Sequence, residues 1–228
     1  VLSPTLGGVI GRNVPPGLDW NTLPRKIDVV LVTHNHLDHM DAPTLRRLGP
    51  DPVYCVPHGL GKWFRRSGLG RVVEMQWWQR ESIAGLDITF VPAQHWSRRG
   101  LNDINASWWG GFVIERGGIR VYHSGDTAWF EGFAEIGQRC GEIDAAMLPI
   151  GAYAPRWFMR QQHMNPDDAV KAFAALGARR FVAMHWGTFK LTDEDLREPP
   201  QLLREIWQQQ QRAPSQQEIP AIGETLRF

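Results

Sequence analysis

The stretch that decides the fold is Thr33-His34-Asn35-His36-Leu37-Asp38-His39. It follows an apolar, β-branched run, residues 27–33, that is typical of a strand buried on both faces. In an extended segment, residues two apart face the same way, so His34 and His36 can hold one metal ion together. A turn directly afterwards would let Asp38 and His39 face a second ion. Imidazole and carboxylate ligands suit zinc, and also iron or manganese.

Each ion needs more ligands than this motif supplies, so further ligands are expected at the ends of later strands. Residues 86–92 read as a strand that leads to His95, and residues 179–184 as one that delivers His185. Asp126 follows residues 119–123, the second half of a predicted hairpin, and could bridge both ions. The sequence therefore predicts several strands that end in one shared metal site.

The alternative is that these histidines are structural. A single histidine after a strand is more often a satisfied loop or core residue than a ligand, and a crowded loop can simply be solvated. Three histidines and one aspartate within six positions are hard to explain in that way, which favours a dinuclear site. His123 lies inside an alternating strand, where packing or support of a ligand is favoured over ligation. His58 is given no role.

The rest of the chain predicts one α/β domain over residues 1–228. Further strands are expected at 53–56, 71–75, 108–115 and 143–150, and helices at about 42–48, 130–139, 166–176 and 200–211. Asp41 and Asn165 precede two of these helices as expected N-caps. A closing edge strand is expected at 224–228. There are no internal repeats and no internal linker.

Composition narrows the class of function. The formal net charge of +1 offers no field for nucleic acid, so a nucleic-acid phosphodiesterase is disfavoured. Two distant cysteines fit a reducing compartment, and the lack of a spanning run or signal peptide predicts a cytoplasmic protein. Eleven tryptophans suit peripheral contact with a membrane, although aromatic pairs are more often core.

The residues also carry a family resemblance. THNHLDH (33–39) resembles the HxHxDH signature of the metallo-β-lactamase superfamily, and Gly125-Asp126-Thr127 resembles its bridging-aspartate loop. Longer blocks are similar to the N-acylphosphatidylethanolamine-hydrolysing phospholipase D family, including bacterial RomA-like members; they are PAQHWSRRGLNDINASWWGGF (92–112), SGDTAWF (124–130), PIGAYAPRWFMRQQHMNPDDAV (149–170) and HWGTFKLTDEDLREPP (185–200). The resemblance implies an αββα sandwich. It also implies strands upstream of residue 24, which we expect to be missing from this chain.

The resemblance further implies a site and an activity. It places His34, His36 and His95 on one zinc ion and Asp38, His39 and His185 on the other, with Asp126 shared between them. Asp38 or Asp126 would orient the nucleophile. His163 would bind a phosphate oxygen or protonate the leaving alkoxide, and Tyr153, Arg156 and Trp157 would line the substrate pocket.

The implied substrate is a phospholipid. Cleavage of N-acylphosphatidylethanolamine at the phosphodiester would give phosphatidic acid and an N-acylethanolamine. The family also suggests a homodimer. Two alternatives stay open: a hydrolase of the same fold acting on a lactone or another phosphodiester, and a non-enzymatic binding module. The seven intact ligand positions argue against the binding module.

Overall fold

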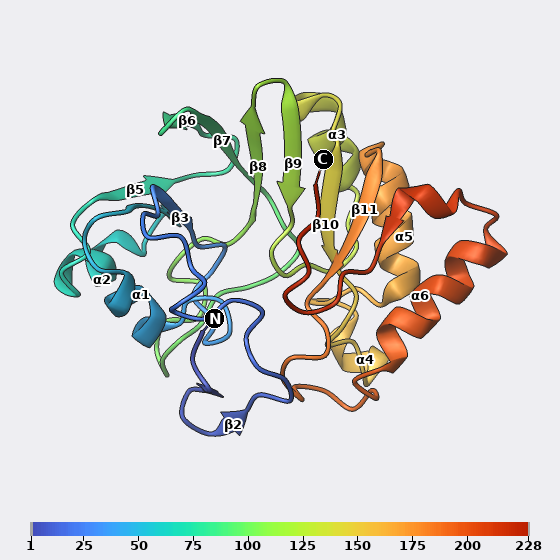
Figure 1. The fold of residues 1–228 in the computed structure, drawn as a ribbon, viewed down its shortest axis with the longest axis horizontal. Coiled ribbons are helices and arrows are strands. Elements are labelled where there is room, and N and C mark those ends of the chain that lie inside the picture. Colours follow the sequence, from blue (N-terminus) through green and yellow to red (C-terminus); the bar gives the residue numbers. More distant parts are fainter. Residues whose placement is uncertain (1, 228) are drawn as a thin grey trace.

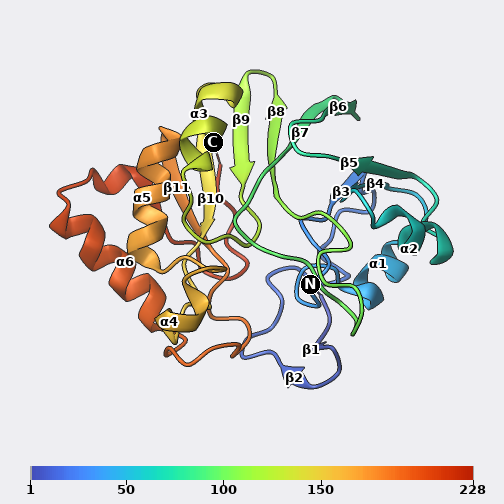
Figure 2. The same ribbon diagram turned by 180° about the vertical axis from the view of Figure 1, so that it is seen from behind.

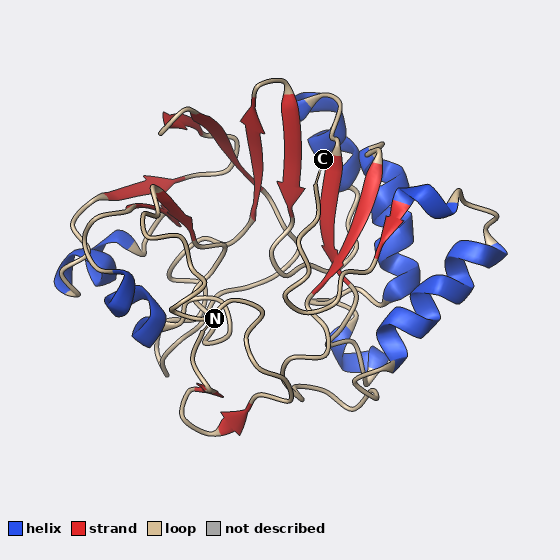
Figure 3. Ribbon diagram, viewed as in Figure 1, coloured by secondary structure: helices blue, strands red, loops and turns tan. Residues whose placement is uncertain are grey.

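Two β-sheets pack face to face, and helices cover their outer faces (Figures 1 and 3). The computed structural model describes residues 2–227. Helices α1 and α2 accompany the smaller sheet, whereas α3, α5 and α6 lie against the larger one, as the reverse view also shows (Figure 2). This is the expected αββα sandwich. Among residues 2–227, no helix combines the length and apolar character needed to cross a bilayer.

The larger sheet is mixed. Its strand order is β12-β11-β10-β9-β8-β7-β6, parallel from β12 to β9 and antiparallel from β9 to β6. The strands are β6 (Arg80–Ile83), β7 (Leu86–Val91), β8 (Gly111–Arg116), β9 (Ile119–His123), β10 (Ala145–Pro149), β11 (Arg180–Met184) and β12 (Gln217–Glu218). In Figure 1 the arrows of β9 and β10 point to the same lower edge of this sheet. The loops that leave the parallel strands therefore meet at that edge.

The smaller sheet is parallel, with the order β3-β4-β5. Its strands are β3 (Val29–Leu31), β4 (Val53–Pro57) and β5 (Val72–Met75), and its helices are α1 (Ala42–Leu48) and α2 (Gly61–Arg66). A short hairpin of β1 (Thr5–Leu6) and β2 (Ile10–Gly11) precedes it. Between the two sheets, Cys55 and Met75 pack with Phe90 and Phe112 in one buried cluster. This layer fixes how the two sheets face each other.

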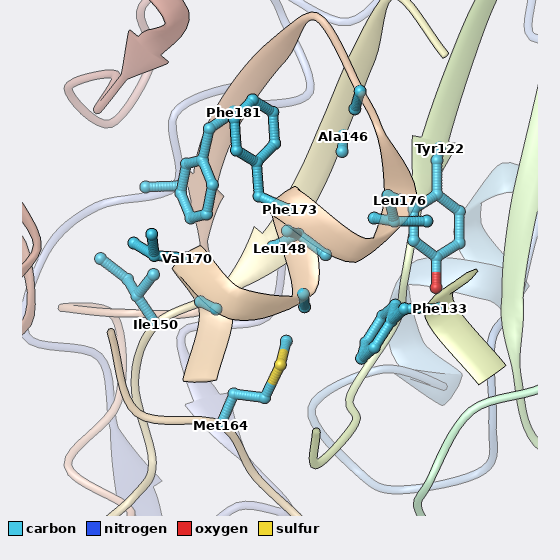
Figure 4. Close-up of a cluster of buried hydrophobic side chains, with 14 of the residues drawn as sticks. Tyr122, Phe133, Ala146, Leu148, Ile150, Met164, Val170, Phe173, Leu176 and Phe181 are labelled. Atoms are coloured by element: carbon cyan, nitrogen blue, oxygen red, sulfur yellow. The ribbon is translucent and has the colours of Figure 1, made fainter. Parts of the chain in front are cut away.

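The largest core lies between the larger sheet and its helices, which are α3 (Gly132–Cys140), α5 (Pro166–Leu176) and α6 (Glu198–Gln209). Figure 4 shows Phe173 of α5 beside Phe181 of β11. Their ring centroids are 5.7 Å apart, and Trp207 of α6 lies 5.4 Å from Phe173. Aromatic pairs at such distances add to the free energy gained from burying their area.

Helix α5 begins and ends where the sequence predicts. The Asn165 side chain accepts a hydrogen bond from the Asp168 backbone N–H at 3.0 Å, and Gly177 ends the helix in the left-handed conformation. The predicted cap of α1 is only half right. Asp41 occupies the N-cap position, but its carboxylate accepts from Ser3 and from the Thr44 hydroxyl, and it caps no backbone N–H of the helix.

Most predicted strands and helices are present within two or three residues of the expected bounds. The closing edge strand at 224–228 is wrong for the described residues 224–227, because β12 at Gln217–Glu218 takes the edge beside β11; Phe228 lies outside the described residues. The structure adds α2, β6, the hairpin β1–β2, the short helix α4 (Arg156–Met159) and the 3-10 turn η1 (Pro214–Gln216). The single-domain organisation stays a prediction.

Replacing Phe173 by alanine tests the main core. The substitution Phe173→Ala should lower the free energy of unfolding by about 3–5 kcal/mol, because it removes a buried ring and leaves a cavity. Phe158→Ala is the control, since that ring is 55% exposed and its loss should cost less than about 0.5 kcal/mol. Urea unfolding curves measure both. Equal losses in the two variants would contradict this view of the core.

Candidate metal centre

Four strands deliver the predicted ligands to one place. The loop after β3 carries His34 to His39, and the loops after β7, β9 and β11 carry His95, Asp126 and His185. The backbone before Asp126 requires a glycine. Gly125 has a positive φ of 63°, and a Cβ at that position would lie 2.8 Å from the Gly110 carbonyl oxygen. The loop that presents Asp126 therefore needs glycine before it.

Three imidazoles form the first group, which we call the three-histidine group: His34, His36 and His95. Nδ1 of His36 lies 3.0 Å from Nε2 of His34 and 3.2 Å from Nε2 of His95. The three ring nitrogens thus converge on one point in the loops that follow β3 and β7.

The second group, which we call the mixed group, contains Asp38, His39, Asp126 and His185. Nε2 of His39 lies 3.3 Å from Nε2 of His185 and 3.0 Å from Oδ2 of Asp126. Oδ2 of Asp38 lies 3.6 Å from His39 and 3.5 Å from His185. Asp126 also lies between the groups, because its Oδ2 is 3.9 Å from Nε2 of His34 and 4.0 Å from Nε2 of His95.

These spacings fit metal ions. Ligand atoms held about 2.0–2.1 Å from a tetrahedral ion lie about 3.3 Å from one another. The close ligand pairs of both groups lie between 3.0 and 3.6 Å apart. Asp126 Oδ1 is buried and accepts no hydrogen bond, although Nε2 of His185 lies 3.2 Å away, so this oxygen has a lone pair to offer to a cation. The donor set therefore suits two ions, one in each group.

The electrostatics favour the ligand forms of these side chains. Burial lowers the pKa of His34, of His36 and, to about 3, of His95. Burial opposes ionisation of Asp38, but the charge of His39 and a hydrogen bond from His185 lower its pKa to about 2. Neutral imidazole and ionised carboxylate are the forms that bind metals.

His185 is the exception. Burial opposes its protonation, but Asp126 and Asp38 raise its pKa to about 9. Burial likewise opposes ionisation of Asp126, whose pKa is nevertheless lowered by His185 and His39. The attraction that raises the pKa of His185 is the one that these two carboxylates would exert on a cation.

Supporting hydrogen bonds fix two of the imidazoles. The Thr33 hydroxyl lies 3.0 Å from Nδ1 of His34, and the Gln162 carbonyl oxygen lies 3.0 Å from Nδ1 of His95. A carbonyl can only accept, so His95 carries its proton on Nδ1 and presents the lone pair of Nε2 to the group. Sequence reasoning gave Gln162 no role, since a backbone carbonyl leaves no mark on residue type.

The structure brings His163 to the same place. Its buried ring lies 5.1 Å from the His95 ring and 5.7 Å from the His185 ring, and its Nδ1 has no hydrogen-bond partner. With His95 and Asp126 it forms a third set of residues close enough to share an ion. His123 supports the neighbouring loop instead, because its Nδ1 accepts from the Gly125 backbone N–H at 3.1 Å.

The three predicted substrate residues have other partners. The Tyr153 hydroxyl donates to Glu198 at 2.5 Å, and Arg156 bonds the His163 carbonyl oxygen and the Asp168 carboxylate. Trp157 is 78% exposed and packs on Phe158. Their contact with a substrate stays a prediction.

A cavity of about 210 Å³ opens beside the mixed group. It is lined by Asp38 and His185 at one side, by Arg12, and by segment 186–199 with the apolar side chains of Phe189, Leu191 and Leu196. The cavity is more than ten times the roughly 10–15 Å³ that one water needs, so it can admit a ligand. Sequence reasoning missed Arg12 and most of this wall, which carry no recognisable spacing.

The cavity wall is held by one carboxylate. Glu194 accepts hydrogen bonds from the backbone N–H groups of Ala152, Tyr153 and Ala154, at 2.6, 3.2 and 3.0 Å. Asn13 ties the N-terminal segment to the same wall, because its backbone N–H donates to the Thr188 carbonyl oxygen at 2.8 Å. The wall is therefore a fixed surface of the site.

Comparisons with known proteins identify the family and the fold. A family model described as "Beta-lactamase superfamily domain" matches residues 7–186. The chain is 38% identical over 209 residues to an N-acyl-phosphatidylethanolamine-hydrolyzing phospholipase D 1 of Caenorhabditis elegans; the match covers 86% of this chain and 58% of the worm protein. It is 32% identical over 176 residues to a UPF0173 metal-dependent hydrolase of Archaeoglobus fulgidus, covering 75% of this chain and 71% of that relative. Among solved structures, Igni18, a metallo hydrolase of Ignicoccus hospitalis, superposes with a TM-score of 0.67 at 25% identity, over 89% of this chain and 80% of that one.

The substitution Asp126→Asn tests the shared carboxylate. It keeps the size of the side chain but removes the charge between the two groups, so zinc should bind both groups more weakly. Loss of a ligand should exceed the roughly 10–100-fold that an outer partner costs. Elemental analysis after dialysis and competition with a chelator measure this. Asp87→Asn, at a half-exposed position on β7, is the matched control, and wild-type zinc affinity in Asp126→Asn would contradict the bridging role.

Proposed function

The chain belongs to the metallo-β-lactamase superfamily, and from that premise we propose that it is a metal-dependent phosphodiesterase of the phospholipase D type. At the coarser level it is a metal-dependent hydrolase of this fold. The observation that carries the proposal is the pair of ligand groups that share Asp126, with 3.0 Å from its Oδ2 to His39 and 3.2 Å from its Oδ1 to His185. In the proposal, the seven ligands are the predicted ones: His34, His36, Asp38, His39, His95, Asp126 and His185.

Two divalent ions, zinc as first choice and iron or manganese as alternatives, would supply a water of lowered pKa and positive charge for the phosphoryl oxygens. The chain's own residues do the rest. Asp126 lies between the two groups and joins them, and Asp38 or Asp126 orients the nucleophile. His163 lies beside both groups and hydrogen-bonds a phosphate oxygen or protonates the leaving alkoxide.

Two observations support a lipid phosphodiester as substrate. The worm relative at 38% identity is named for hydrolysis of N-acyl-phosphatidylethanolamine, although the chain spans little more than half of its length. The cavity beside the mixed group is lined in part by the apolar side chains of Phe189, Leu191 and Leu196. Such a wall suits a molecule that carries an apolar part next to the group bound at the metal centre. Peripheral contact with a membrane and a homodimer belong to the same proposal.

Hydrolysis of N-acylphosphatidylethanolamine in detergent micelles tests the proposal. We expect phosphatidic acid and N-acylethanolamine from zinc-loaded protein, a loss of at least about 100-fold on chelation, and recovery on adding zinc. The substitution His39→Ala should abolish the recovery because it removes a ligand. His58→Ala should leave it intact, since His58 is exposed and faces Trp108.

A parallel panel of lactones and simple phosphodiesters separates the alternatives. Protein that binds two zinc ions, leaves the lipid intact and opens a lactone would be a hydrolase of the same fold acting on another bond. That result would overturn the lipid assignment.

A further inference from the structure

Segment 160–165, between α4 and α5, touches the metal centre twice. The Gln162 carbonyl oxygen accepts from Nδ1 of His95 at 3.0 Å. The next residue, His163, places its ring against His95 and His185. The position of this segment therefore determines which ring nitrogen of His95 carries the proton. It also determines where His163, the predicted catalytic histidine, lies.

Arg156 holds the segment from outside the centre. Its Nη1 donates to the His163 carbonyl oxygen at 3.0 Å, and its Nη2 donates to Oδ2 of Asp168 at 2.6 Å. Asp168 lies in the first turn of α5, and its backbone N–H is capped by Asn165 at 3.0 Å. The guanidinium thus joins α4 to α5 and grips the segment between them.

The two bonds of Arg156 fix the position of segment 160–165 more than they raise the free energy of unfolding. The side chains of Arg156 and Asp168 are 36% and 25% exposed, and partly solvated pairs of this kind add little to the free energy of unfolding. The planar fork of arginine reaches two acceptors in a fixed direction, which a lysine ammonium does not. Its loss should therefore loosen the segment while the sheets and helices remain folded.

We propose that Arg156 is a positioning residue that acts, through Gln162, on the orientation of His95 and hence on metal binding by the three-histidine group. The inference rests on the metal centre proposed above but not on the lipid substrate. Outer partners of metal-bound histidines are typically worth 10–100-fold in affinity. Among the described residues, Gln162 contacts no member of the mixed group, and His163 meets His185 only through ring stacking at 5.7 Å, so the mixed group should lose much less affinity.

Zinc titration of the whole 228-residue chain, labelled with ¹⁵N-histidine, tests this, because the ring nitrogens of each group report its own occupancy. Arg156→Met should weaken zinc binding at the three-histidine group by about 10–30-fold and change the mixed group by less than threefold. Before zinc is added, the ring signals of His95 should show partial loss of the form protonated on Nδ1. Arg156→Lys should recover part of the affinity, and Asp168→Asn should reproduce part of the loss.

Arg179→Met is the matched control. Arg179 also bridges two acidic residues, Glu142 at 2.6 Å and Asp144 at 3.1 Å, but it lies directly before β11, at the end of that strand opposite His185. It should leave zinc binding unchanged. If Arg156→Met fails to fold, the Arg156→Lys and Asp168→Asn variants still decide the matter.

Unchanged zinc affinity and unchanged His95 signals in the Arg156 and Asp168 variants would overturn the proposal, as would equal losses in both groups. Failure of the proposed function is distinguishable from this. It would appear in the wild-type protein, either as absence of zinc binding or as absence of lipid hydrolysis with zinc bound.

Discussion

The buried carboxylate of Asp126 is the constraint on which the site depends. An ionised carboxylate is costly to bury unless positive charge and hydrogen bonds surround it. Here it is 4% exposed and surrounded by imidazoles from three separate loops. So many imidazoles can surround the Asp126 carboxylate only where strands of both sheets end close together. The αββα sandwich brings these strand ends together. The buried layer of Cys55, Met75, Phe90 and Phe112 holds the two sheets against each other.

The fold and the side chains that it gathers at the candidate site were largely predictable, because both leave a local mark on the sequence. The polar cluster after the apolar run at residues 27–33 predicts the end of a strand, and Asn165-Pro166 predicts the start of a helix. Even so, Asp41 shows the limit of such reasoning. Its residue type predicts a cap, but a hydroxyl from the distant Ser3 competes for the carboxylate. The residue type indicates which hydrogen bond a side chain prefers. Which bond it makes depends on the groups that the tertiary fold brings beside it.

The supporting parts of the site could not be predicted for a similar reason. Gln162 acts through its backbone carbonyl, so its side chain says nothing of the role. Glu194 is one acidic residue in a charged stretch, and only the fold shows that three backbone N–H groups converge on it. Arg156 shows the converse. The family resemblance implies that it lines the substrate pocket, whereas its two hydrogen bonds go to the His163 carbonyl oxygen and the Asp168 carboxylate.

Most of the cavity wall comes from one segment, residues 186–199, which follows the last predicted ligand in the chain. None of the other strand-end loops that hold ligands has to change when this segment changes. Insertions or substitutions there could therefore alter which molecules enter, while the chemistry at the strand ends persists. In such a fold, the residues at the strand ends can stay the same while the residues that contact the substrate change. That separation gives a physical reason why one metal centre can serve many different hydrolases.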